Sequence, residues 1–415
     1  MALVVQKYGG SSLATAEHIK NVAGRIGRTF DDGNQVVVVV SAMGGTTNDL
    51  IDLAESVADQ PDQREMDVLL STGELVSCTI MAMALRSLGY KAISLSGAQA
   101  GIETTTSYGQ AQIAGMNPDR IMSELDADHI VIVAGFQGVT PDLNVTTLGR
   151  GGSDTTAVAV AAALRAARCE VYTDVEGIYT ADPRRVPKAQ KLEEIGFEEM
   201  LELASYGVKM NPRSIELGMV YDTPILVASS TDDGPGTLIH GETDMNRDVG
   251  EIRNRVGGIA TDTNVAKITV RNVRDRPGIA ANLFEPLADQ GISVDVIVQN
   301  ASVDGATDMT FTVKRTDLDR ARHVVEEVSR EFGGAEVITA SDLAKLSIVG
   351  TGMLDATGYA SKMFRTLADN EINIEMITTS EIRITCIVAE GQLDRAARAL
   401  HSAFDLDGPE SGATG

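Results

Sequence analysis

The sequence contains no tryptophan, and its phenylalanines and tyrosines bring the aromatic residues to only 4% of 415 residues. The hydrophobic cores must therefore be built from valine, isoleucine, leucine, alanine and methionine. Cysteine is also scarce: Cys78, Cys169 and Cys386 lie far apart, in apolar surroundings and without the spacing of metal ligands. We expect three buried free thiols, which indicates a reducing compartment.

Targeting segments are missing as well. The N-terminal residues MALVVQKY lack the basic stretch and the long apolar run of a signal peptide. No apolar run approaches the length that spans a membrane. The sequence therefore predicts a cytoplasmic protein.

The sequence has few basic residues, 35 against 59 acidic ones, and a net charge of −24. This surplus repels nucleic-acid phosphates and anionic lipid, so neither nucleic acid nor a membrane surface is expected as a partner. A small anionic substrate is not excluded, because a site can be locally basic in an acidic protein. The length exceeds that of one ordinary core and predicts two or three domains.

What the first 240 residues do contain is an alternation of two patterns. Short Val/Ile-rich runs without polar alternation occur at residues 36–40, 130–134, 170–173 and 224–228, and helical patterns at 14–29, 67–88, 155–167 and 197–206. This alternation predicts an α/β domain with helices on both faces of a mainly parallel sheet. The stretches QKYGGSS, SAMGG, GFQGV and YTDVEG each follow a strand, and ligands bind at that end of such sheets.

Beyond a polar segment at residues 241–263, which we expect to be an irregular linker, the sequence contains an internal repeat. Residues 277–279 and the following DQGISVDVIVQ correspond, 80 residues later, to residues 357–359 and DNEINIEMITT. Each copy has the pattern of a ferredoxin-like β-α-β-β-α-β unit. The first copy has a candidate last strand at residues 336–340, whereas the second shows no strong final strand.

The most informative loop is TLGRGGSDTTA, at residues 147–157. Gly149, Gly151 and Gly152 would expose backbone N–H groups, and Ser153 or Asp154 would cap the alanine-rich helix that follows, whose positive end favours an anion. An ordinary glycine turn with an N-cap would explain these residues, but it gives no reason for an arginine between the glycines. Arg150 can hold a carboxylate in bidentate fashion.

The other glycine loop, QKYGGSS, is neither a Walker A loop nor a GxGxxG loop. Phosphates would have to be held by the N–H groups of Gly9 and Gly10, with Lys7 as the charge. The alternative is a strand that ends in a glycine turn, with Lys7 solvated.

Two further stretches leave alternatives open. The loop at residues 171–184 could wrap an adenine and a ribose, or it could be an ordinary connection. Glu74 lies in the apolar helical stretch LLSTGELVS, where a carboxylate is either a paired structural group or a ligand for an ammonium group.

The motifs KYGGSS, SAMGGTTNDL, LSTGEL, VAGFQGV, LGRGGSDTTA and YTDVEGIYTADPR occur in this order and precede the paired repeat. Together they closely resemble the aspartate kinases that have a kinase domain followed by two ACT domains. The resemblance implies an αβα sandwich of the amino-acid-kinase type at residues 1–245 and ACT domains at residues 264–342 and 343–415. It also implies phosphoryl transfer from MgATP to the β-carboxylate of L-aspartate, the first step toward lysine, threonine and methionine. Lysine, threonine or both would inhibit through the ACT domains.

The resemblance assigns roles to residues, and it implies no metal ligand from the protein. Lys7 and Asp154 would be catalytic, Lys7 by neutralising the transferring phosphoryl group and Asp154 by orienting Lys7. The nucleotide would be bound by Lys7, Tyr8, Gly9, Gly10, Ser41, Thr173, Asp174, Tyr179, Asp182, Arg184 and, more weakly, Lys209. Aspartate would be bound by Thr47, Glu74, Arg150, Gly151, Gly152 and Ser153, and the effectors by Asp275, Gly278, Ile279, Gln299, Asn300, Ser380 and Glu381. For Ser380 and Glu381 the alternative is that the second repeat serves only in assembly.

One departure concerns Asn211, which stands where the family commonly has a histidine, so the part of this segment in nucleotide contact is left open. ACT sheets usually pair edge to edge, so we expect a homo-oligomer, or an assembly with a shorter regulatory chain that starts at a methionine such as Met245. Two alternatives remain: a kinase for glutamate or a nucleoside monophosphate, and a sensor that binds amino acids without turnover.

Overall fold

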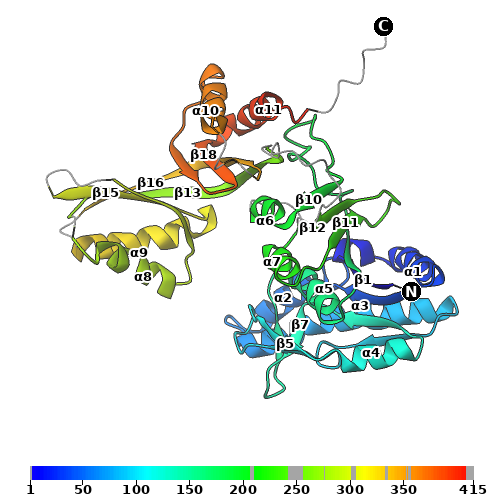
Figure 1. Cartoon of the computed structure of the whole chain (residues 1–415). Coiled ribbons are helices and arrows are strands. Elements are labelled where there is room, and N and C mark those ends of the chain that lie inside the picture. The colour runs from blue at the N-terminus through cyan, green and yellow to red at the C-terminus, as the bar shows by residue number, and fades with distance from the viewer. Residues whose placement is uncertain are drawn as a thin grey trace, which may run out of the picture. The chain divides into compact units, whose positions relative to one another are not determined.

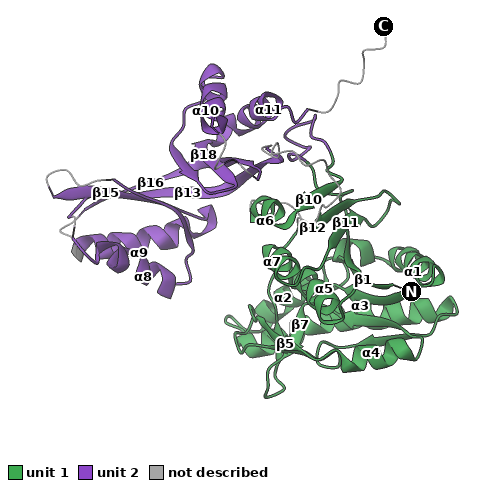
Figure 2. Cartoon of the chain, viewed as in Figure 1, with its two compact units in different colours: residues 1–179, 191–249 green, residues 180–190, 250–415 purple. Residues whose placement is uncertain are grey.

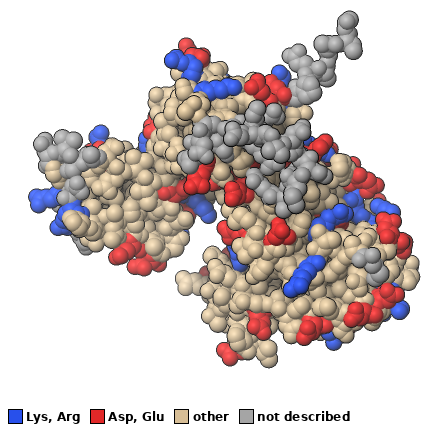
Figure 3. Space-filling model, viewed as in Figure 1, with Lys and Arg blue, Asp and Glu red and all other residues tan. Residues whose placement is uncertain are grey.

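The computed structural model describes residues 2–205, 210–241, 256–274, 276–300, 305–331, 335–351, 353 and 357–407. The chain divides into two compact units (Figures 1 and 2). The first comprises Met1–Tyr179 and Lys191–Val249, and the second comprises Thr180–Gln190 and Gly250–Gly415. The segment 180–190, expected within the kinase domain, thus packs with the second unit. Acidic side chains are spread over both units on the face shown in Figure 3, in keeping with the negative net charge.

An eight-stranded sheet with the order β10-β12-β11-β9-β1-β2-β6-β3 forms the centre of the first unit. Neighbouring strands are parallel except for β11 and β12. Its strands are β1 (Leu3–Tyr8), β2 (Gln35–Val40), β3 (Ala92–Leu95), β6 (Ile130–Ala134), β9 (Arg168–Thr173), β10 (Glu194–Gly196), β11 (Ile225–Ser229) and β12 (Thr237–His240). A second sheet, β5-β4-β7-β8, contains β4 (Ile102–Thr104), β5 (Ile113–Met116), β7 (Gln137–Val139) and β8 (Val145–Thr147).

Helices pack on both faces of the large sheet, because its central strands are apolar on both faces. Val36, Val38 and Val40 share one core with α1 and α3, whereas α5 packs against β1, β2 and β9. The helices of this unit are α1 (Ala16–Asp31), α2 (Thr46–Val57), α3 (Gln63–Ser87), α4 (Asp119–Asp126), α5 (Gly152–Ala163), α6 (Phe197–Ser205) and α7 (Pro212–Val220), with a 3-10 turn, η1 (Gly10–Leu13). The predicted α/β class is confirmed, and the four predicted strands and four predicted helices are present as β2, β6, β9, β11, α1, α3, α5 and α6.

Helix α3 is longer than expected and differs from one prediction. Asp62 caps it by accepting from the N–H groups of Arg64 and Glu65. By length and composition alone its 25 residues could cross a membrane, so the expectation that no segment is long enough is wrong. The helix packs against β3 and β6, and its carboxylates Asp67 and Glu74 are buried in the protein.

The second unit is built on one six-stranded antiparallel sheet with the order β14-β15-β13-β16-β18-β17. Its strands are β13 (Gly258–Arg274), β14 (Val294–Gln299), β15 (Ala306–Val313), β16 (Glu336–Val349), β17 (Met376–Thr379) and β18 (Arg383–Ala389). Its helices are α8 (Ile279–Asp289), α9 (Leu318–Glu331), α10 (Tyr359–Asp369) and α11 (Leu393–Ala403), with 3-10 turns η2 (Arg315–Asp317) and η3 (Glu390–Gln392). Helices α8 and α9 cover one core and α10 and α11 another, so each repeat has its own core.

The last strand of the second repeat comes from a segment that precedes the first repeat. Residues 258–262 of β13 pair with residues 345–349 of β16, while residues 267–271 pair with residues 336–340. The long strands β13 and β16 therefore each serve both repeats. The expectation of an irregular linker is wrong for residues 258–263, and the predicted last strand at residues 336–340 is present as the start of β16.

Candidate active site

A cavity of about 620 Å³ opens at the carboxyl ends of β1 and β2 in the first unit. The amino ends of α2 and α5 and one side of α3 complete its wall. It brings together ten of the predicted residues, which come from four separate stretches of chain. These are Lys7, Gly10, Ser41, Thr47, Glu74, Arg150, Gly151, Gly152, Ser153 and Asp154.

Lys7 and Asp154 form the charged centre of this cavity. The Lys7 Nζ lies 2.6 Å from Asp154 Oδ1, and only 11% and 13% of the two side chains are exposed. Asp154 lies in the first turn of α5, so the carboxylate fixes the ammonium group beside the amino end of that helix. An anion placed there would meet both a fixed positive charge and the positive end of the helix dipole.

The turn after β1 packs tightly against the turn after β2. A Cβ atom on Gly10 would lie 2.7 Å from the Ala42 carbonyl oxygen, and the N–H of Gly44 donates to the Gly10 carbonyl at 2.9 Å. Only glycine permits this approach of two backbones.

We expect Gly10→Ala to lower kcat/KM about 100-fold. The new Cβ would push apart the two turns that border Lys7, and a displacement of about 1 Å near the reacting groups lowers rates by this factor. Gly24→Ala in α1 is the matched control, since a Cβ there meets nothing within 4 Å. Steady-state kinetics of both variants, with circular dichroism to confirm folding, checks the prediction. Equal activities would show that the two turns can move apart without harm.

The Arg150 turn is held from outside the motif. Gly149 and Gly151 have φ of 76° and 72°, which suits glycine. The side-chain amide of Asn211 donates to the Arg150 carbonyl at 2.9 Å, and Arg213 donates to the Leu148 carbonyl at 2.8 Å. Asn211 also caps α7. It therefore supports the turn that carries Arg150, a contact that the sequence alone did not indicate.

Asp67 is a second residue that sequence reasoning missed. Its carboxylate accepts from the N–H of Gly109 and from both the N–H and the hydroxyl of Thr147. It joins α3 to β8 and to the loop before β5, all beside the cavity. Asp67 lies seven residues before Glu74, two turns earlier in the same helix, and this spacing could have indicated that both carboxylates face the cavity.

Glu74 is buried, with 3% of its surface exposed. One carboxylate oxygen accepts from the N–H of Ala42 at 3.0 Å, and the other has no hydrogen-bond partner among the described residues. Burial raises the pKa of Glu74 to about 7, and the hydrogen bond from Ala42 opposes this rise. A buried, incompletely paired carboxylate on the wall of a cavity is suited to bind an ammonium group.

The side chain of Tyr8 differs from its predicted place. Alternation along β1 turns it away from Lys7. Its ring is fully buried in the core with α1 and α3 and stacks on Tyr172, with 4.9 Å between the ring centroids. Any contact of Tyr8 with a nucleotide would thus be limited to its backbone.

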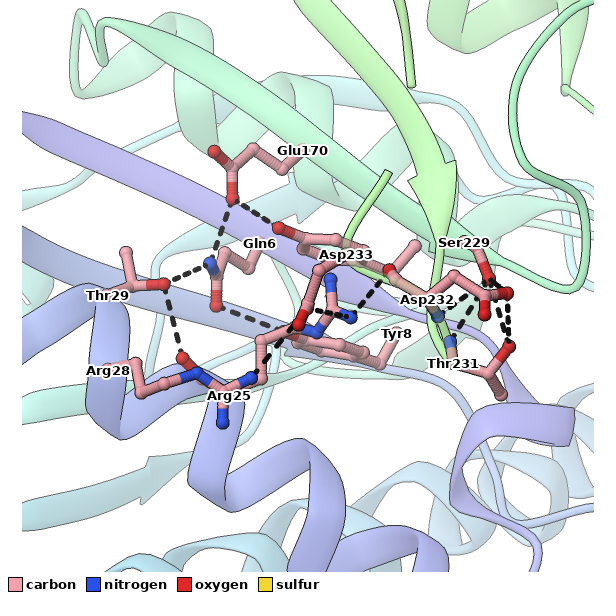
Figure 4. A network of polar contacts seen from close by, with 11 residues as sticks. Gln6, Tyr8, Arg25, Arg28, Thr29, Glu170, Ser229, Thr231, Asp232 and Asp233 are labelled. Atoms are coloured by element: carbon pink, nitrogen blue, oxygen red, sulfur yellow. Dashed lines mark hydrogen bonds and ion pairs between the residues drawn. The ribbon is translucent and has the colours of Figure 1, made fainter. Parts of the chain in front are cut away.

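A buried polar network supports β1 and β9 on that same face (Figure 4). Gln6 Nε2 donates to Glu170 at 2.8 Å, and the Tyr172 hydroxyl donates to the same oxygen at 3.0 Å. Arg25 of α1 lies over the Tyr172 ring and donates to the Asp232 carbonyl at 2.8 Å. The network ties β1, β9 and the loop after β11 together, behind the strand ends that carry Lys7 and Thr173.

The other predicted nucleotide residues that the structure describes do not line this cavity. Thr173 ends β9, and its hydroxyl contacts Asp174. The Tyr179 hydroxyl donates to Glu176, and Arg184 forms an exposed ion pair with Asp182 that lowers the pKa of Asp182. Lys209 lies outside the described residues.

The predicted effector residues lie at two ends of the second unit's sheet. Strands β13 and β14 run in the same direction, since both are antiparallel to β15. Gly278 and Ile279 at the start of α8 therefore belong to the same end as Gln299, the last residue of β14, and Asn300 after it. Ser380 and Glu381 follow β17, at the end where β16 and β17 both finish. Asp275 and Met245 lie outside the described residues.

Residues 2–229 match the amino acid kinase family model, and residues 268–328 and 346–404 match the ACT domain model. The chain is 50% identical over 414 residues to the aspartokinase of Corynebacterium glutamicum, with 99% of this chain and 98% of that one covered. The chain belongs to the aspartate kinases. The family assigned from the motifs is therefore confirmed.

Solved structures of this family show the same fold. E. coli aspartokinase III in complex with aspartate and ADP has a TM-score of 0.80 at 26% identity, with 97% of this chain and all of that chain covered. The same enzyme in complex with lysine and aspartate has a TM-score of 0.76 at 26% identity, covering 97% and 99%. The fold of nearly the whole chain is thus shared with the E. coli enzyme.

Proposed function

We infer that the chain transfers the γ-phosphoryl group of ATP to the β-carboxylate of L-aspartate and yields 4-phospho-L-aspartate. One observation carries this assignment: the Lys7–Asp154 pair, the incompletely paired Glu74 and Arg150 line a single cavity. Glu74 would bind the ammonium group of aspartate and Arg150 a carboxylate, with Thr47 and the 151–153 turn beside them. The relationship to enzymes that bind aspartate and ADP supports this choice.

The chemistry needs no general base. The attacking β-carboxylate has a reference pKa of about 4 and is already ionised at neutral pH. Catalysis then depends on positioning and on stabilising charge on the transferring group. Lys7 would supply that charge between the β- and γ-phosphates, and Asp154 would hold Lys7 in place. The backbone at Gly9, Gly10 and Ser41 would contact the phosphates.

ATP would enter with Mg²⁺, which neutralises phosphate charge when bound. Among the described residues, no three His, Cys, Asp or Glu side chains are grouped as metal ligands. Phosphate oxygens and water would therefore hold most of the ion. Thr173, Asp174, Tyr179, Asp182, Arg184 and Lys209 would bind the rest of the nucleotide.

The second unit would bind lysine, threonine or both as feedback inhibitors of amino-acid biosynthesis. The glycine-led amino ends of α8 and α10, with φ of 90° at Gly278 and 110° at Gly358, suit an α-carboxylate. The edge strands β14 and β17 suit pairing with another copy or a shorter regulatory chain. Three buried free cysteines fit the cytoplasm.

The test is ATP consumption with L-aspartate, with the acyl phosphate trapped as its hydroxamate, in the presence and absence of lysine and threonine. We expect aspartate-dependent turnover that falls with lysine, threonine or both. An enzyme that prefers glutamate or UMP to aspartate would show that the assigned substrate is wrong. Turnover that neither lysine nor threonine lowers would show that the chain is not feedback-inhibited by them. Amino-acid binding without turnover would identify a sensor.

A further inference from the structure

Segment 180–190 directly follows Tyr179 and belongs to the second unit. Its apolar side chains Ala181, Val186 and Ala189 pack in the core of the second repeat, together with Leu400 and Phe404 of the α11 region. The stretch proposed to contact nucleotide thus continues without interruption into the regulatory unit.

A buried set of polar contacts joins this segment to α11. His401 is fully buried, its Nε2 lies 2.8 Å from the Thr180 hydroxyl, and its Nδ1 lies 2.8 Å from Asp407. Because the carboxylate can only accept, Nδ1–H donates to Asp407, and in the neutral ring this leaves Nε2 to accept from the Thr180 hydroxyl. The Thr180 oxygen in turn accepts from the Gln190 N–H at 2.9 Å. We call these three side chains, Thr180, His401 and Asp407, the α11 clasp.

Contacts around the α11 clasp fix the position of its Thr180. The Thr180 carbonyl accepts from the Ile259 N–H at 2.7 Å, which fixes the backbone of Thr180 against β13. Outside the core, Arg185 pairs with Asp394 at 2.5 Å and Lys188 with Asp407 at 3.2 Å. Packing alone would be served by an apolar residue at position 401, since burying an imidazole requires both nitrogens to find partners. The polar residue instead specifies one position for Thr180.

We propose that His401 is a positioning residue for ATP binding, acting through Thr180 on the loop that contains Tyr179, Asp182 and Arg184. The inference rests on the proposed nucleotide role of these three residues. Thr180 is bonded to Tyr179 and lies two residues before Asp182, so a change at the clasp displaces both. The second ACT repeat thereby sets nucleotide affinity, even though none of its own helices need touch ATP.

Two substitutions of His401 separate the two halves of the clasp. The amide of asparagine can occupy the place of Nδ1, so His401→Asn keeps the Asp407 contact and loses Thr180. The longer glutamine can reach the place of Nε2, so His401→Gln keeps Thr180 and loses Asp407. Thr180→Val removes the hydroxyl at nearly constant volume, and Thr180→Ser restores it. His323→Gln, on an exposed histidine of α9, is the control.

We expect His401→Asn to raise the KM for ATP about tenfold through the loss of one buried hydrogen bond. Thr180→Val should raise it at least as much, because it also removes the acceptor of the Gln190 N–H, while kcat and the KM for aspartate stay within about twofold in both variants. The double variant should add little to Thr180→Val, since both single substitutions remove the contact between Thr180 and His401. His401→Gln and Thr180→Ser should retain the wild-type KM for ATP, although melting temperatures fall for both His401 variants. An unchanged KM for ATP in His401→Asn and Thr180→Val would overturn the inference. A KM for ATP that rises in every variant in proportion to its loss of melting temperature would also overturn it, because the effect would then be one of stability.

Calorimetry with ADP keeps this outcome distinct from failure of the loop assignment. Arg184→Ala and Asp182→Asn should weaken ADP binding if the loop contacts nucleotide. Wild-type ADP affinity in these two variants would remove the loop assignment, and with it the route by which His401 is proposed to act on ATP binding. If ADP binds more weakly to Arg184→Ala and Asp182→Asn but with wild-type affinity to His401→Asn and Thr180→Val, the loop assignment stands and the positioning role of His401 is rejected.

Discussion

Replacement of Lys7 by alanine is expected to lower kcat about 1,000-fold, a loss of roughly 4 kcal/mol of transition-state stabilisation. The ammonium group lies 2.6 Å from Asp154 in a cavity that excludes most water from both side chains. A fixed charge in such a place stabilises developing charge more strongly than it stabilises bound substrate. The KM for ATP should therefore change much less than kcat.

Rapid-quench measurement of acyl phosphate formation tests this directly, because it separates chemistry from product release. Lys20→Ala, on the exposed side of α1, serves as the control for loss of one positive charge from the same unit. Asp154→Asn should lower kcat by a smaller factor, since it leaves the ammonium group present but less well oriented. A loss below about tenfold in Lys7→Ala would show that the charge on the phosphoryl group is neutralised elsewhere.

The large parallel sheet was predictable from sequence because its strands have a local signature. The predicted run at residues 130–134 coincides with β6, and the run at residues 36–40 lies within β2. Both are uniformly apolar because helices cover both faces. The strand that completes the second repeat has no such signature, since residues 258–262 read GIATD and their partner lies 80 or more residues away along the chain. Long-range pairing of a mixed sequence cannot be read from local pattern.

Some residues of the candidate active site could likewise be predicted from the sequence, and others could not. Arg150 was found because an ordinary glycine turn gives no reason for its charge, whereas Lys7 and Glu74, which had structural alternatives, were assigned through the resemblance of the motifs to the family. Asn211 and Asp67 were missed because they act on backbone groups of distant residues. The direction of the Tyr8 side chain, by contrast, followed from strand alternation beside Lys7 and was available from the sequence.

The second large effect concerns Glu74 and aspartate. We expect Glu74→Gln to raise the KM for aspartate about 100-fold, because an ammonium group loses a buried charged partner worth roughly 3 kcal/mol. Glutamine preserves the size of the side chain and can still accept from the Ala42 N–H. Glu65→Gln, at the exposed first turn of the same helix, is the control. A KM close to that of the wild type would place the ammonium group of aspartate elsewhere.

The pH dependence of that KM provides an independent check. With the pKa of Glu74 near 7, the carboxylate of the free enzyme is mostly protonated at pH 6 and mostly ionised at pH 8. Only the ionised form attracts an ammonium group, so the KM for aspartate of the wild type should fall as pH rises between these values. In Glu74→Gln it should be high and nearly independent of pH. Parallel profiles for the two enzymes would assign the titration to another group.

The same pKa predicts a conflict between stability and substrate binding. Burial raises the pKa of Glu74 from 4.5 to about 7, so the folded state holds a proton that the unfolded state releases between these values. The free energy of unfolding therefore falls as pH rises from 4.5 to 7, by up to about 3 kcal/mol from this group. Without aspartate, Glu74→Gln should unfold at higher urea concentration than the wild type at pH 8 and at nearly the same concentration at pH 4.5. A variant less stable at both values would mean that the carboxylate is paired in the free enzyme and that its charge costs the fold nothing.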